Sequence, residues 1–426
     1  KLEAITILKS KVEGYADLSF AEDTQNPAAL NLRDRVDQVL TDSSNRVLFF
    51  EMWFKELSAE VTQNLIQHSG DLHYFLETMT RFKPFTLTEL EERMINLKDV
   101  NGIDAIVNLY EMITNQFKFK LEIDGKTEII TRDQLSNYFS SSSPEMRASA
   151  YQELYRVYIE SSTVLAQMYI HRARDWHTEG LELRGFASPI SARNVVNDLP
   201  DEVVETLLTV CRKNADVFQR YFKMKAQWLG LEKLRRYDIY APLTPSEKKF
   251  DYGTAKQMVM DSYRAFSPDA ANLAQRVFDT NHLDSEIRAG KRGGAFCYTA
   301  LPELTPWVLM SYDGSARDIA TLAHELGHAI HAMLAEHHSA LTQQASLPLA
   351  ETASVFAEMQ LTDQLLKQEN DPAVRRDLLA NALDDSYITV MRQAYFSIFE
   401  KDAHQMINDN CTMDELTEHY LEILKE

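Results

Sequence analysis

A single helix signature near residue 320 constrains this chain more than any other feature. Ser315 and Asp318 have the spacing of a capping box, and the apolar run that follows carries His324, Glu325 and His328 in the pattern His-Glu-x-x-His. Four residues advance a helix by about 400° and about 6 Å, so both imidazoles project from one face and can reach a single ion. Glu325 points about 100° away, too far round the helix to be a ligand.

The two histidines predict a zinc site. Neutral imidazole nitrogens bind Zn²⁺ at about 2.0 to 2.1 Å, and a catalytic zinc site keeps one position open for water. The metal lowers the pKa of that water, and Glu325 is placed to take its proton and pass it to a leaving amine. The pattern therefore predicts one Zn²⁺ per chain and hydrolysis of peptide bonds. The alternative, a buried helix with two satisfied histidines, requires a charged Glu325 among apolar residues.

The third ligand must come from another part of the chain. His331 shares the helical face, but it lies about 10 Å from His324 along the axis, too far for one ion with bonds near 2 Å. A second helix is expected to begin near Pro348 and to pack antiparallel to the first. Glu351, 23 residues beyond His328, lies in its opening turn. Glu351 is therefore the predicted third ligand.

Two further residues are predicted to support the ligands. Glu358, seven positions after Glu351, falls on nearly the same helical face. It is expected to accept a hydrogen bond from a ligand histidine and so fix its tautomer, although a solvent-facing carboxylate is the alternative. His331, on the first helix, is the second residue predicted to support the ligands. The longer metzincin pattern fails, because it requires glycine at position 331 and histidine at position 334, where this chain has Leu334.

Most of the chain has the three- and four-residue apolar spacing of helices, as in Phe50, Phe54, Leu57, Val61 and Leu65, for which Asp42, Ser43 and Ser44 are cap candidates. Ser143-Pro144 and Ser267-Pro268 predict two further helix starts. A hairpin is expected at about 117–131, turning at Asp124-Gly125. Extended segments are expected at 293–298 and 307–312.

We predict a mainly α protein with a boundary near residue 185. This boundary separates an N-terminal helical region, 1–185, from a catalytic region, 186–426.

Composition excludes several classes of partner. The chain has 426 residues and a formal net charge of −20, which disfavours nucleic acids and anionic membrane surfaces. Its three cysteines, Cys211, Cys297 and Cys411, show no disulfide or metal spacing, and we see no apolar run of about 18 residues. These features predict a cytoplasmic protein. The chain starts at Lys1 without a methionine, so N-terminal sequence is expected to precede it. Nothing indicates the oligomeric state.

The chain resembles the oligoendopeptidase F family, which is related to thimet oligopeptidase and neurolysin. The resemblance is carried by segments on both sides of the His-Glu-x-x-His helix as well as by the helix itself, namely residues 234–243, 290–297, 308–310, 318–331, 349–354 and 390–396. Together these segments are far more specific than the five-residue pattern.

The resemblance implies a two-lobed helical zincin-type metallopeptidase, with a small hairpin or sheet near the active site, that cuts internal bonds of oligopeptides. It also implies that His324, His328 and Glu351 bind zinc and that Glu325 is the base. The segment containing Gly294, Ala295, Phe296 and Tyr298 would bind the substrate backbone as an added strand, and an ordinary core hairpin is the alternative.

The end of the chain departs from this family. Members continue well past the position of Glu426 and supply histidine and tyrosine donors to the oxyanion, so the catalytic region is expected to be truncated. Possible substitutes are His404, His419, Tyr387, Tyr395 and Tyr420. Three alternatives stay open: a catalytically silent zinc- or peptide-binding protein of the same fold, an exopeptidase such as a carboxypeptidase or dipeptidase, and a structural helical protein with an accidental motif. Substrate and cleavage preference are not specified by the sequence.

Overall fold

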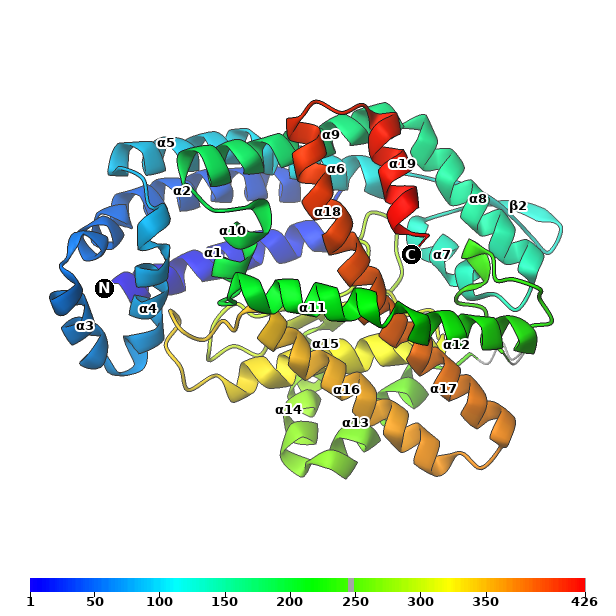
Figure 1. Ribbon diagram of the computed structural model, residues 1–426. Coiled ribbons are helices and arrows are strands. Elements are labelled where there is room, and N and C mark those ends of the chain that lie inside the picture. The colour runs from blue at the N-terminus through cyan, green and yellow to red at the C-terminus, as the bar shows by residue number, and fades with distance from the viewer. Residues whose placement is uncertain (244–248, 426) are drawn as a thin grey trace. The chain divides into compact units, whose positions relative to one another are not determined.

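The computed structural model describes residues 1–243 and 249–425 and shows a mainly helical chain with small sheets, as predicted (Figure 1). Contacts divide the chain into two compact units. Unit 1 combines Lys1–Gln116 with Lys249–Leu361, and unit 2 combines the described residues of 117–248 with those of 362–426. The predicted division near residue 185, between an N-terminal and a catalytic region, stays a prediction.

Helices form most of unit 1, and several pack in sequential pairs. Helix α1 lies beside α2, and both are blue in Figure 1; α5 packs on α2 and α6, while α13, α14 and α15 contact one another. The helices of unit 1 are α1 (Leu2–Glu22), α2 (Pro27–Glu56), α3 (Ala59–Gln67), α4 (His73–Phe82), α5 (Glu89–Asn101), α6 (Ile103–Asn115), α13 (Tyr252–Phe266), α14 (Pro268–Asp279), α15 (Ala316–Leu334) and the first part of α16 (Leu347–Gln368).

One predicted helix start in unit 1 is wrong. Asp42, Ser43 and Ser44 lie inside α2, which begins at Pro27 with Asn26 as its side-chain cap. The apolar series that begins at Phe50 is also divided, because α2 ends at Glu56 and Ser58 caps α3. Short polar residues can cap a helix but are tolerated inside one where their side chains reach solvent, so local composition did not distinguish the two cases.

A three-stranded sheet completes unit 1 and lies beside α15. Its strand order is β3 (Leu283–Asp284), β5 (Trp307–Leu309), β4 (Phe296–Tyr298), with β3 parallel and β4 antiparallel to β5. Both β4 and β5 contact α15. The extended segments predicted at 293–298 and 307–312 are confirmed in part, because strands form only at Phe296–Tyr298 and Trp307–Leu309. Strand β4 is an edge strand of the described sheet.

Unit 2 contains the predicted hairpin and a second group of helices. Strands β1 (Phe119–Ile123) and β2 (Lys126–Ile130) pair around Asp124 and Gly125, both of which have positive φ, as a tight two-residue turn requires. The helices are α7 (Arg132–Asn137), α8 (Pro144–Glu160), α9 (Ser162–Trp176), α10 (Pro189–Val196), α11 (Asp201–Lys213), α12 (Ala215–Trp228), the rest of α16, α17 (Pro372–Ser386), α18 (Gln393–Asn408) and α19 (Met413–Ile423).

Short irregular helices join these elements. Two π-helical segments, η4 (His177–Leu183) and η6 (Tyr387–Arg392), continue α9 and α17, and a short 3₁₀ helix, η5, covers Arg236–Asp238. Further 3₁₀ turns lie at Gly70–Leu72, Lys83–Phe85 and Tyr138–Ser140. The predicted starts at Ser143-Pro144 and Ser267-Pro268 are confirmed, because each serine caps the helix that its proline begins.

A buried ion pair connects α8 to η5 within unit 2. Arg147 Nη2 donates to Asp238 Oδ1 at 2.8 Å, and Arg235 Nε donates to Asp238 Oδ2 at 2.6 Å. Arg147 is 2% exposed and Asp238 is fully buried. Burial alone would raise the pKa of Asp238, but hydrogen bonds from Arg235 and Arg147 outweigh it and hold that pKa below its ordinary value.

Among the helices that the structure describes, none has both the length and the apolar content needed to cross a lipid bilayer.

Candidate metal centre

Helix α15 presents the His-Glu-x-x-His residues from a firmly anchored backbone. The predicted capping box is present: Ser315 Oγ accepts from the Asp318 amide at 3.1 Å, and Asp318 Oδ2 accepts from the Ser315 amide at 2.9 Å. One face of the helix is buried, and Tyr263 Oη donates to the Ala323 carbonyl at 2.6 Å. The orientation of the two histidines is therefore set by the packing of the whole helix.

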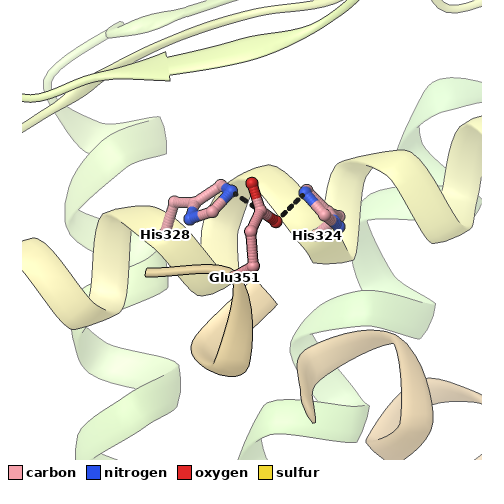
Figure 2. Close-up of side chains that lie close together, drawn as sticks. All are labelled: His324, His328 and Glu351. Atoms are coloured by element: carbon pink, nitrogen blue, oxygen red, sulfur yellow. Dashed lines mark ion pairs between the residues drawn. The ribbon is translucent and has the colours of Figure 1, made fainter. Parts of the chain in front are cut away.

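The structure brings His324, His328 and Glu351 together. Figure 2 shows the Glu351 carboxylate, from the first turns of α16, between the two imidazoles of α15. One donor atom from each residue lies within 4.8 Å of the other two. Glu351 Oε2 is 3.4 Å from His324 Nε2 and 3.6 Å from His328 Nε2.

These separations fit a zinc ion. Two ligands bonded to one ion at about 2.0 to 2.2 Å with tetrahedral angles lie about 3.3 to 3.6 Å apart. Both nitrogen-to-oxygen distances fall in this range, and both exceed a good hydrogen bond. Two imidazoles and a carboxylate are also the donor set of many catalytic zinc sites. The Glu351 side chain is 46% exposed, so water can reach the centre.

Neighbouring side chains orient the three donors. Glu358 Oε1 lies 2.5 Å from His324 Nδ1, and Ser354 Oγ donates to Glu351 Oε2 at 2.8 Å. If His324 Nδ1–H donates a hydrogen bond to Glu358, His324 Nε2 carries the lone pair that a metal needs. Burial lowers the pKa of His324, but the Glu358 hydrogen bond and three nearby carboxylates outweigh it, so the net pKa is raised.

Glu325 lies next to these donors in a dry environment. Its side chain is 5% exposed, and no hydrogen bond to its carboxylate is found within the described part of the chain. Burial, together with the charges of Glu351 and Glu358, raises its pKa to about 7 against the opposing effect of His324. A carboxyl group in that range can accept and release a proton near neutral pH.

Gly327 is a functional position that the sequence analysis missed. A Cβ at this residue would lie 2.9 Å from the Ala353 carbonyl oxygen, 2.9 Å from the Ala357 Cβ and 3.0 Å from the Ser354 Cα. Real Cβ atoms do not approach neighbours so closely, so a side chain here would push α16 away from α15. The glycine inside the His-Glu-x-x-His pattern was the available signal, because a helical glycine often marks close backbone approach.

The segment predicted to bind substrate lies at the free edge of the sheet. Phe296 and Tyr298 belong to β4, and Ala295 and Gly294 precede it. Gly294 has φ +85°, and a Cβ at this position would meet no atom within 4 Å. Burial, and secondarily the charge of Glu325, raise the pKa of the intervening Cys297 thiol. Strand β4 contacts α15, the helix that carries Glu325.

The remaining candidates lie outside the group of three donors. His331 is partly buried on α15, where its charge contributes to the lowering of the His328 pKa, after the larger effect of burial. The five residues considered as oxyanion donors, His404, His419, Tyr387, Tyr395 and Tyr420, all belong to unit 2. Their predicted role stays a prediction.

Known proteins resemble this chain along most of its length. The family model described as "Peptidase family M3" matches residues 137–426. Group B oligopeptidase PepB of Streptococcus agalactiae is 25% identical to this chain; the match covers 98% of this chain and 71% of PepB. Oligopeptidase PepF of Bacillus subtilis is 24% identical; the match covers 97% of this chain and 62% of PepF. The crystal structure of oligoendopeptidase-F from Enterococcus faecium has a TM-score of 0.70 at 21% identity, covering 98% of this chain and 71% of that one. The predicted resemblance to oligoendopeptidase F is confirmed.

Proposed function

Because the chain belongs to peptidase family M3 and is therefore a peptidase, we propose that it hydrolyses internal bonds of oligopeptides with one zinc ion held by His324, His328 and Glu351. The observation that carries the proposal is the pair of separations between the Glu351 oxygen and the two histidine nitrogens, 3.4 and 3.6 Å, which match the edges of a zinc tetrahedron better than hydrogen bonds. The relatives named oligopeptidase support the substrate class.

In this proposal each residue has a separate task. Zinc, when bound, supplies a Lewis acid that lowers the pKa of water and polarises a carbonyl group. Glu325 takes a proton on its carboxylate from the attacking water and later delivers it to the leaving amine. Glu358 holds the Nδ1 proton of His324, which directs Nε2 toward the metal, and Ser354 fixes the carboxylate of Glu351.

The substrate is proposed to bind along β4. The outer edge of this strand is free of strand partners in the described sheet, so its backbone can pair with an extended peptide. Gly294, just before the strand, lets a second backbone approach closely. The side chains of Phe296 and Tyr298 would contact alternate residues of that peptide. A cytoplasmic location remains our prediction from the cysteine pattern.

The test compares Glu325→Gln with the wild type on peptides of increasing length. The variant should keep one zinc per chain and lose about 100-fold or more in kcat, because only the proton acceptor has been removed. Glu336→Gln is a matched control: this residue pairs with Arg276 just beyond the end of α15 and should change neither quantity.

Mass spectrometry of the products distinguishes the alternatives. Internal cleavage supports the endopeptidase proposal, whereas release of single residues or dipeptides from one end would make the chain an exopeptidase. Bound zinc without cleavage by the wild type would indicate a silent zinc- or peptide-binding protein. Cleavage at the wild-type rate by Glu325→Gln would refute the proposed role of this residue.

A further inference from the structure

We propose that Arg236 and Arg392 of unit 2, together with the hydroxyl of Tyr240, form a site that binds a carboxylate group of an oligopeptide substrate. The proposal rests on the peptidase function proposed above and adds a recognition site within unit 2. Its evidence is independent of the metal centre, because all three residues and their contacts lie inside unit 2.

Tyr240 joins the two arginines. Arg392 Nη1 donates to Tyr240 Oη at 3.2 Å, across 152 positions of sequence. The guanidinium carbon of Arg236 lies 5.8 Å from the centre of the Tyr240 ring. The two cationic groups are therefore held around one phenol.

Neither arginine has a carboxylate partner among the described residues. The neighbouring Arg235 pairs with Asp238, and so does Arg147. Arg236 and Arg392 instead face aromatic rings: Arg236 lies 6.0 Å from the Tyr151 ring, and Arg392 lies 5.2 Å from the Phe396 ring.

Aromatic rings hold a guanidinium in place without neutralising it. Cation–π contacts use the face of the guanidinium plane, so its N–H groups remain available to an acceptor in that plane. Arg236 is exposed and Arg392 is partly exposed, so an incoming anion can reach both. A carboxylate matches this arrangement, because its two oxygens accept parallel N–H bonds from arginine.

The backbone at Arg392 gives a second reason to expect a binding site. Tyr387–Arg392 is a π-helical segment between α17 and α18, with Arg392 as its last residue. π-Helical turns are rare and occur frequently at functional sites, because the extra residue redirects side chains that a regular helix would place elsewhere. Here the segment places Arg392 beside Tyr240.

Peptide chemistry supplies such a carboxylate from two sources, the C-terminus and an acidic side chain. The experiment measures binding by isothermal titration calorimetry to the zinc-loaded Glu325→Gln chain, so that it does not depend on turnover. Three forms of one seven-residue peptide are compared. The first has a free C-terminus and no acidic residue, the second is amidated, and the third is amidated with one glutamate.

We expect the free-acid form to bind about ten- to a hundredfold more tightly than the amidated form, the range of a charge-assisted hydrogen bond. Arg392→Gln and Arg236→Gln should each bring this ratio to within about threefold, and Arg392→Lys should give an intermediate value because lysine lacks the planar fork. Tight binding of the amidated glutamate peptide would show that side-chain carboxylates are also accepted.

Arg156→Gln is the matched control for charge. Arg156 also belongs to unit 2, but it pairs with Glu153 and Glu160, so its loss should leave the ratio unchanged. The proposal is overturned if the Glu325→Gln chain with both arginines intact binds the free-acid and amidated peptides equally well. It is also overturned if the Arg392→Lys and Arg236→Gln variants are folded and keep the full preference for the free-acid peptide. Failure of the peptidase proposal would be seen separately, as absence of cleavage by the wild type.

Discussion

Around the candidate metal centre, burial and the charges of neighbouring side chains set the properties of individual residues. Glu325 is almost inaccessible to solvent, which raises its pKa to about 7, while Glu351 is half exposed and completes the donor set. We propose different roles for these two carboxylates because their environments differ. Glu358 Oε1 lies 2.5 Å from His324 Nδ1, and we propose that it acts through that histidine.

Replacing Glu358 with glutamine should weaken zinc binding about 10- to 100-fold, because the amide is a poorer acceptor for the His324 Nδ1 proton. A competition titration of zinc against a fluorescent chelator measures this affinity. Asp363→Asn, which removes an exposed carboxylate paired with Lys367 on the same helix, serves as the control. Equal zinc affinity in Glu358→Gln and the wild type would rule out the supporting role.

At the scale of elements, the metal centre depends on how closely α15 and α16 approach. The proposed ligands come from both helices, and at Gly327 the two backbones approach closely: a Cβ there would lie 2.9 Å from the Ala353 carbonyl oxygen. Because the Glu351 oxygen must lie within about 3.6 Å of each histidine nitrogen to share an ion, a small shift of α16 would remove a ligand.

Gly327→Ala should therefore destabilise the protein by about 1 to 3 kcal/mol, the usual cost of overpacking, and should weaken zinc binding as well. Denaturant unfolding and the zinc titration measure the two effects. Gly180→Ala provides the comparison, since a Cβ at Gly180 meets no atom within 4 Å. A Gly327→Ala protein with wild-type stability and zinc affinity would show that the helices can separate without cost.

Helix α8 and segment η5 are joined by the buried Arg147–Asp238 pair. Asp238→Asn leaves Arg147 buried without its anion, which should cost about 3 to 5 kcal/mol at neutral pH. The folded-state pKa of Asp238 lies below its ordinary value of 3.8, so its stabilisation is present above that value and is lost as the pH falls through the folded-state pKa.

The difference in the free energy of unfolding between wild type and Asp238→Asn should therefore be largest above about pH 5 and shrink below about pH 4. Urea unfolding at a series of pH values measures it. A difference that stayed constant from pH 7 to pH 3 would mean that the Asp238 charge contributes nothing, and that the variant acts through packing alone.

At the scale of the whole molecule, the two proposed sites belong to different units. The three proposed metal ligands belong to unit 1, and the two arginines proposed to bind a carboxylate belong to unit 2. A ligand that binds only the folded state stabilises it, by about 2.7 kcal/mol when its free concentration is 100 times its Kd. Zinc should therefore stabilise the helices that hold it.

Removal of zinc by a chelator should lower the thermal midpoint and increase amide hydrogen exchange in α15 and the first turns of α16. Helix α18 in unit 2 should change much less. Hydrogen exchange followed by mass spectrometry locates the effect, and Glu351→Ala, which lacks one ligand, should respond weakly to zinc. Equal loss of protection in α15 and α18 would contradict a centre confined to unit 1.

The sequence by itself determined the features that depend on neighbours a few residues apart. The capping box at Ser315 and Asp318, the shared face of His324 and His328 and the tight turn at Asp124-Gly125 follow from local backbone geometry, and the structure contains each. The prediction of a helix start at Asp42–Ser44, also made from local sequence, was wrong, because these residues lie inside a longer helix.

Tertiary structure decided what requires contact between distant segments. The close approach of α16 at Gly327, the burial that raises the pKa of Glu325 and the meeting of Arg392 with Tyr240 depend on packing across many intervening residues. Sequence spacing specifies directions along one helix, but it does not specify the distance to the next helix or the exclusion of water. Those two quantities determine whether the donors share one ion and whether Glu325 can exchange a proton near neutral pH.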